Sequence, residues 1–84
     1  MTDSSPPDAP HVAARSDIAQ IVGARTFAFR KEKKLSRRAL ADAAGVSERY
    51  LQMLEKGDGN VTIQLLDRVA QALGVTVVDL IRPE

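Results

Sequence analysis

An all-α fold of five short helices is predicted by three features of the 84-residue sequence. Four Ser or Thr residues each stand immediately before a run whose apolar residues recur at helical spacing. Three of these runs close on a glycine, the residue that most readily takes the left-handed conformation found at helix ends. No stretch shows the sustained apolar–polar alternation that is typical of a half-buried strand. We therefore expect a compact helical domain without a sheet.

Residues 1–16 are expected to form a disordered tail, and the helical domain is expected to occupy residues 17–84. The tail contains three prolines and almost no large apolar side chains, so it cannot bury enough surface to offset its ordering entropy. His11, the only histidine, lies in this tail without converging ligands. We expect neither a catalytic nor a metal-binding role for it.

The first helix is predicted to begin at Asp17, whose carboxylate can cap it, and to end near Lys33 or Lys34. Phe27 is expected to lie outside the central core, where its ring could form a partner surface or be partly buried under the N-terminal tail. The apolar positions that are spaced for one face of this helix are Ile18, Ile21, Val22, Ala28 and Phe29.

The second helix is predicted to begin at the Ser36 cap, to direct Leu40 and Ala43 inward, and to end at Gly45. Because a glycine permits a positive φ, the chain can turn there within three or four residues. Another cap and another helix follow directly. This pattern predicts a helix-turn-helix motif over about residues 36–56.

The third helix is predicted to run from the Ser47 cap to Gly57, with Leu51 and Leu54 facing the core. The residues that must then face outward are Glu48, Arg49, Gln52 and Met53. Arginine can bridge guanine O6 and N7, glutamine can pair with adenine, and glutamate can accept from cytosine N4. This face is suited to a DNA major groove, although the same residues taken alone also fit an ordinary solvated face.

The fourth helix is predicted to begin at the Thr62 cap and to end at Gly74. Thr76, followed three residues later by Asp79, forms a capping box for a short fifth helix. Pro83 discourages any extension of that helix. The residues expected on the inner face of the fourth helix are Ile63, Leu66, Val69, Ala70 and Leu73.

Charge is distributed unevenly, although the net charge is only +1. Residues 25–38 hold seven basic side chains and one acidic one, whereas acids outnumber bases seven to four from residue 39 onward. This basic segment fits a surface that faces a polyanion, and equally a solvated helix end whose cations favour the helix dipole. No cysteine is present, and no nucleophile–base pair, metal-ligand cluster or phosphate loop can be assembled. We expect no enzyme, no metal and no cofactor, and a cytoplasmic protein.

The segment LSRRALADAAGVSERYLQMLEKGDGNVTIQLLDRVAQALGVTVVDLI, residues 35–81, is similar to the Cro/C1-type (XRE) helix-turn-helix family. The signals that agree in register are LS at 35–36, LA at 40–41, AGVS at 44–47, LE.G at 54–57 and ALGV at 72–75. The resemblance implies a lambda-repressor-like domain that binds double-stranded DNA as a homodimer, with its third helix in the major groove. We therefore expect a sequence-specific transcriptional repressor that recognises an inverted-repeat operator.

The same resemblance assigns roles to individual residues. It implies base contacts from Glu48, Arg49 and Met53, with Gln52 beside them, and a structural ion pair between Arg30 and Glu55. The residues expected to contact phosphate are Ser36, Arg37, Arg38, Ser47, Tyr50, Lys56 and Gly57. Tyr50 could also pack against the turn, and the Asp58 carboxylate would repel a phosphate near the loop. The sequence departs from the family pattern at Thr26, Phe27, Arg37 and Arg38.

Three alternatives remain open from the sequence. The domain could act mainly through a partner protein, as an antitoxin does, using Ile21, Ala24 and Phe27. The segment SERYLQMLEKGDGN is also similar to the DNA-binding half of benzoate-degradation regulators, in which a shikimate-kinase-like domain senses an effector. The chain could then be the DNA-binding part of such a two-domain regulator. A dimer could form through residues 75–81 or through the Phe27 surface.

Overall fold

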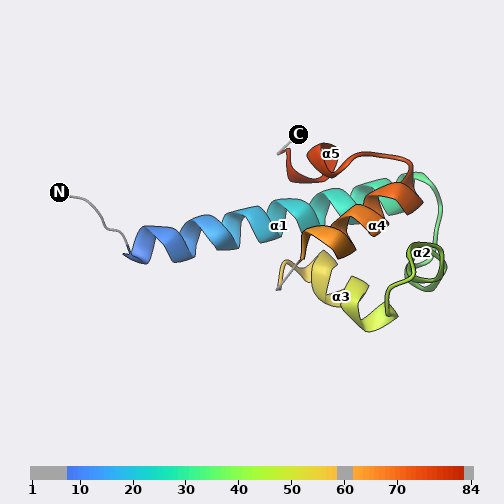
Figure 1. Cartoon of the computed structure of the whole chain (residues 1–84), viewed down its shortest axis with the longest axis horizontal. Helices are drawn as coiled ribbons and strands as arrows, with labels where there is room; N and C mark the ends of the chain where they lie inside the picture. The colour runs from blue at the N-terminus through green and yellow to red at the C-terminus, as the bar shows by residue number, and fades with distance from the viewer. Residues whose placement is uncertain (1–7, 59–61, 83–84) are drawn as a thin grey trace.

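Five helices make up the computed structural model, which describes residues 8–58 and 62–82 (Figure 1). The described residues contain no strand, so the prediction of an all-α fold is confirmed. Residues 75–78, which resemble a strand in sequence, lie in the turn before the last helix and in its first residues. The helices are α1 (Asp8–Glu32), α2 (Arg37–Ala44), α3 (Glu48–Lys56), α4 (Ile63–Leu73) and α5 (Val77–Ile81).

The predicted caps all form at the starts of α2 to α5. Each hydroxyl accepts a hydrogen bond from the backbone N–H three residues later, at 2.9 to 3.1 Å. Such a bond satisfies one of the N–H groups that a helix start leaves without a partner. The capping box of α5 is complete, because the Asp79 carboxylate also accepts from the backbone N–H of Thr76 at 2.9 Å. The capping residues are Ser36, Ser47, Thr62 and Thr76.

The predicted glycines end α2, α3 and α4 in the left-handed conformation, with φ between 72° and 78°. The end of α1 has the same arrangement without a glycine, since Lys34 takes a φ of 60°. The Leu35 N–H donates to the Arg30 carbonyl at 3.0 Å. In the helices that end on a glycine, the residue after the glycine makes the equivalent hydrogen bond. The chain thus leaves α1 through a lysine in a strained backbone region, which the sequence did not indicate.

One hydrophobic core joins all five helices. α1 packs on α3 and α5, while α2 packs on α3 and α4. As predicted, Leu40, Leu51 and Leu54 are buried from the helix-turn-helix segment. The fourth and fifth helices add Leu66, Val69, Ala70, Leu73 and Leu80. The outer surface of the motif is therefore mounted on a rigid base.

The first helix begins at Asp8, so the predicted start at Asp17 is wrong. Residues 8–16, expected in the disordered tail, continue the helix, and residues 1–7 lie outside the described part of the chain. A helix already held at one end gains a hydrogen bond for every residue added, and the alanines in this segment favour it. Pro10 stands in the first turn, where no N–H has to be donated.

No helix in the described residues is long and apolar enough to span a membrane.

Several apolar positions predicted to face inward are exposed. Ile63 at the start of α4 is 71% exposed and Ile18 is 56% exposed, and Ala28 and Ala43 also lie at the surface. Ala41 and Ala44 take the place predicted for Ala43, because the crossing of α2 over α3 and α4 turns a slightly different stripe inward. The inward stripe of α1 consists of Val22, Gly23, Thr26 and Arg30. Phe27 is 45% exposed, as predicted.

Candidate nucleic-acid interface

The helix-turn-helix segment is a tightly held unit. Gly45, with a φ of 72°, sends the chain directly from α2 into the turn, and the N–H of Val46 returns to the Ala41 carbonyl at 3.1 Å. Val46 packs against the core. From α4, Arg68 donates through Nη1 to the Gly45 carbonyl at 3.4 Å. The turn is thus fixed by the core on one side and by α4 on the other.

The outer face of α3 carries the four side chains predicted to read bases. Glu48, Arg49 and Gln52 are exposed, and Met53 is 40% exposed. They face outward because the leucines of the same helix, Leu51 and Leu54, are buried. The helix therefore presents hydrogen-bond donors, acceptors and one apolar side chain together on a free surface. Such a mixture can distinguish base edges in a major groove.

Two capped helix starts belong to the same helix-turn-helix segment as this face. Ser36 opens α2 and Ser47 opens α3, and both side chains are exposed. Each hydroxyl oxygen already accepts a capping bond, which leaves its O–H group able to donate to an anion. The unpaired N–H groups of a helix start add a positive partial charge. Arg38 and Lys56 are exposed as well.

Two predicted phosphate contacts do not fit the geometry. The hydroxyl of Tyr50 is buried without a hydrogen-bond partner among the described residues, so it does not reach the surface. Burial raises the pKa of this phenol above its ordinary value. Tyr50 packs against the core instead. The N–H of Gly57 donates to the Leu54 carbonyl at 3.1 Å, and it is therefore not free for a phosphate.

The expected ion pair between α1 and α3 is present and nearly buried. Arg30 donates through Nε to Glu55 Oε2 at 2.6 Å and through Nη2 to Glu55 Oε1 at 3.0 Å. Its Nη1 donates to the Leu35 carbonyl at 2.9 Å. The two side chains are only 7% and 5% exposed, and the bonds to Glu55 raise the pKa of Arg30. The pair thus joins the end of α1 to α3.

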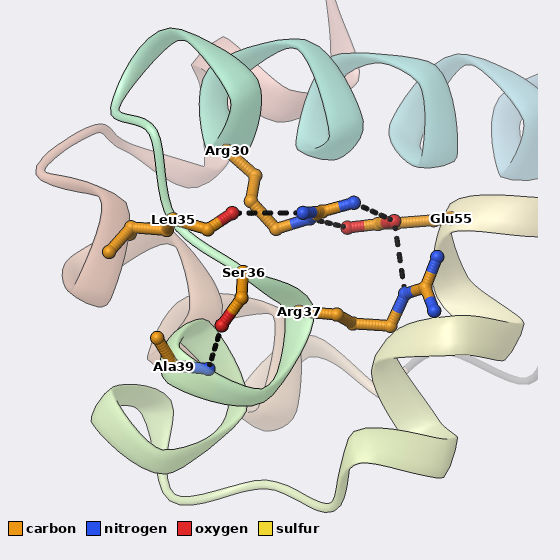
Figure 2. Close-up of polar contacts among 6 residues, drawn as sticks. All are labelled: Arg30, Leu35, Ser36, Arg37, Ala39 and Glu55. Carbon is orange, nitrogen blue, oxygen red and sulfur yellow. Dashed lines mark hydrogen bonds and ion pairs between the residues drawn. The ribbon is translucent and has the colours of Figure 1, made fainter.

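A third side chain reaches this carboxylate. Arg37, the first residue of α2, directs its Nε to Glu55 Oε1 at 3.4 Å, while its side chain remains 37% exposed (Figure 2). From the sequence, Arg37 was expected only to contact phosphate, and its contact with Glu55 was not predicted. Two features could have indicated this contact: Arg37 stands at the start of α2, and Glu55 was already expected to pair with Arg30. Glu55 therefore connects α1, α2 and α3.

The basic segment at residues 25–38 divides into two groups. Arg25 and Arg30 have structural partners: Arg25 donates to the Asp79 carbonyl at 3.2 Å and stacks on Phe29. The remaining side chains of the segment are exposed, apart from the partly exposed Arg37. They are Lys31, Lys33, Lys34 and Arg38. The exposure of these four side chains fits either interpretation of the basic segment, a surface that faces a polyanion or a solvated helix end.

Gly23 is a site residue that the sequence analysis missed. A Cβ atom added to it would meet the backbone oxygen of Leu54 and lie 2.9 Å from that of Glu55. Only a glycine therefore allows α1 to approach the C-terminal half of α3 this closely. A glycine in the middle of a predicted helix was the available signal, since it is otherwise unfavourable there.

The described residues also contain no group of His, Cys, Asp or Glu side chains that could hold a metal.

A helix-turn-helix family, HTH_3, matches residues 28–80 of the chain. The HTH-type transcriptional regulator y4dJ of Sinorhizobium fredii is 39% identical over 67 residues, which cover 80% of this chain and 87% of that protein. The immunity repressor of Bacillus phage phi105 is 40% identical over 63 residues, or 75% of this chain and 44% of the repressor. This chain thus matches less than half of that repressor's length.

Solved structures agree with this relationship. The clp gene regulator ClgR from Corynebacterium glutamicum superposes with a TM-score of 0.71 and 40% identity, over 75% of this chain and 67% of that one. The matched residues contain the capped helices, the glycine turns and the outward face of α3 described above. The chain therefore belongs to the Cro/C1-type (XRE) helix-turn-helix family, a family of DNA-binding transcriptional regulators.

Proposed function

We propose that this protein is a sequence-specific transcriptional repressor that binds an inverted-repeat operator as a homodimer. The observation that carries the proposal is the exposed polar face of α3, which follows a capped helix start and is backed by the buried core. In this arrangement α3 enters the major groove. Glu48, Arg49, Gln52 and Met53 contact base edges, while Ser36, Ser47, Arg38 and Lys56 contact phosphates.

Repression is supported by the similarity to a phage immunity repressor. Two copies of α3 would occupy successive major grooves about 34 Å apart, which requires an inverted repeat in the DNA. A protein with this role acts in the cytoplasm, on the nucleoid.

Selection of bound sequences from random duplex DNA tests the proposal. We expect an inverted repeat whose half-sites are one helical turn apart, and an affinity that falls steeply with salt concentration. Arg49→Ala should lose about 1–3 kcal/mol of preference for the selected sequence, while binding to mixed-sequence DNA changes little. Arg82, exposed beyond α5, provides the control: Arg82→Ala should keep the preference.

One observation favours a second function. Phe27 is 45% exposed on α1, next to the exposed Ala24 and the half-buried Ile21. An exposed aromatic ring beside apolar side chains is suited to a protein partner. If the protein acts mainly through such a partner, no DNA motif is enriched, and Arg49→Ala changes nothing. Phe27→Ser then abolishes the complex.

A further inference from the structure

We infer that Glu55 is a positioning residue for DNA binding: it holds the guanidinium of Arg37 so that both Nη groups form a fixed fork for one DNA phosphate at the start of α2. This inference rests on the proposed DNA-binding function and assigns a role to the contact between Arg37 and Glu55.

The charges in this cluster do not cancel. Arg30 and Glu55 form a nearly buried pair with a net charge of zero. Arg37 adds one positive charge, and its side chain is the exposed member of the three. The excess charge is therefore displayed at the surface, beside the capped start of α2. A phosphate is the anion that complements a cation in that position.

The Glu55 carboxylate has hydrogen-bond donors without the contact from Arg37. Arg30 already gives one hydrogen bond to each carboxylate oxygen, at 2.6 and 3.0 Å. The distance from Arg37 is longer, 3.4 Å, and a partly exposed pair of this kind contributes little to stability. What the contact does achieve is orientation, because it engages Nε and leaves the two Nη groups free of hydrogen bonds within the described residues.

This geometry distinguishes an arginine from a lysine at position 37. A guanidinium is planar and can bond a carboxylate along one edge and a phosphate along another. An ammonium group is a point charge on a flexible stem, and it lacks the fixed edges needed for both contacts. Arg38 is exposed on the same helix, with no contact to Glu55. It serves as the matched control, since any phosphate contact it makes depends on charge alone.

The experiment measures affinity for the selected duplex against salt, with variants at both positions. Arg37→Lys should weaken binding about tenfold, whereas Arg38→Lys, which keeps the charge of a contact that needs no fixed edge, should weaken it clearly less. Arg82→Lys, outside the DNA-binding residues, should bind like the unmodified protein. Arg37→Gln should also lower the slope of log K against log salt by about 0.9, the value for one lost phosphate contact. A thermal melt checks that each variant folds.

The role of Glu55 is tested in two ways. In Glu55→Gln, Arg37→Lys should cost no more affinity than Arg38→Lys costs. Because Glu55→Gln leaves Arg30 without its charged partner and can unfold the protein, the unmodified protein provides an independent measurement. NMR order parameters of the arginine Nε–H groups should exceed about 0.6 for Arg37 and fall below it for Arg38.

The results separate this inference from the proposed function. If the unmodified protein selects no DNA, the proposed function fails, and the inference fails with it. If the protein binds a selected duplex while Arg37→Lys keeps full affinity, or if Arg37 and Arg38 are equally mobile, only the positioning role of Glu55 is overturned.

Discussion

At the scale of single residues, the least favourable feature of the described structure is a pair of buried hydroxyls. Thr26 Oγ1 and Tyr50 Oη are both buried without a hydrogen-bond partner. By contrast, Ser36, Ser47 and Thr62 each use their hydroxyl as a helix cap. Burial of an unpaired hydroxyl costs free energy, since its bonds to water are lost and not replaced. Substitutions that remove the two buried groups should therefore be tolerated.

Thr26→Val should raise the free energy of unfolding by about 1 kcal/mol, because valine keeps the shape and removes the unpaired hydroxyl. Thr26 is 0% exposed, so no solvent contact is lost. Urea denaturation measures the change. The same substitution at Thr62, which caps α4, should lower the free energy by about 1 kcal/mol. A Thr26→Val protein less stable than the unmodified one would indicate that the hydroxyl is paired in solution.

Tyr50→Phe should leave affinity for DNA unchanged, since the Tyr50 hydroxyl is buried and cannot reach a phosphate. The free energy of unfolding should stay the same or rise. A loss of affinity comparable to that of Arg37→Gln would restore Tyr50 to the phosphate-binding surface.

Alkaline titration gives a second check on Tyr50, the only tyrosine of the chain. Its pKa is raised by burial above the ordinary value of 10.0. Because the pKa of Tyr50 is higher in the folded than in the unfolded state, the contribution of its neutral phenol to the free energy of unfolding is complete below pH 10. This contribution is lost as the pH rises toward the pKa of the folded state. Ultraviolet absorbance of the folded protein should show ionisation only above pH 10. Tyr50→Phe should remove this part of the alkaline loss of stability.

At the scale of helices, local chemistry and tertiary packing differ in how well the sequence reveals them. The four caps and three glycine ends were predictable, because each depends on a side chain and a backbone within five residues of it. The inward stripe of α1 was not, because it depends on which helices cross it. Thr26 is buried and Ile18 exposed, against their polarity. In the candidate site, the outward face of α3 was predictable, whereas the contact from Arg37 to Glu55 depends on three helices meeting.

Gly23→Ala tests the closest approach between helices. The new methyl group would meet the Leu54 and Glu55 carbonyl oxygens, which are backbone atoms and cannot move aside alone. The α1–α3 contact must open, and we expect a loss of about 2–3 kcal/mol in the free energy of unfolding. Because Arg30 and Glu55 join the same two helices, DNA affinity should fall as well.

Gly45→Ala supplies the comparison for this prediction. A Cβ atom at Gly45 meets nothing within 4 Å, so its cost comes only from the positive φ and should be about 1 kcal/mol. Urea denaturation of both variants separates steric conflict from backbone strain. Equal losses would show that α1 and α3 can separate without cost.

At the scale of the whole molecule, α1 extends well beyond the body formed by the other helices (Figure 1). Among the described side chains, the first α1 residue in the buried core is Val22. The family match begins later still, at residue 28. The folded unit therefore depends on the second half of this helix.

Removal of residues 1–16 should consequently change the free energy of unfolding by no more than about 0.5 kcal/mol. The shortened chain begins at Asp17, whose side chain can then cap the helix at the boundary that the sequence predicted. Thermal unfolding at equal protein concentration measures the change. Removal of residues 1–22 is the control, since it deletes Val22, which is 3% exposed, and should cost about 2 kcal/mol or more. A large loss of stability on the shorter deletion would show that the projecting half of α1 has a stabilising partner of its own. A second copy of the chain would be the first partner to test, by measuring whether that loss depends on protein concentration.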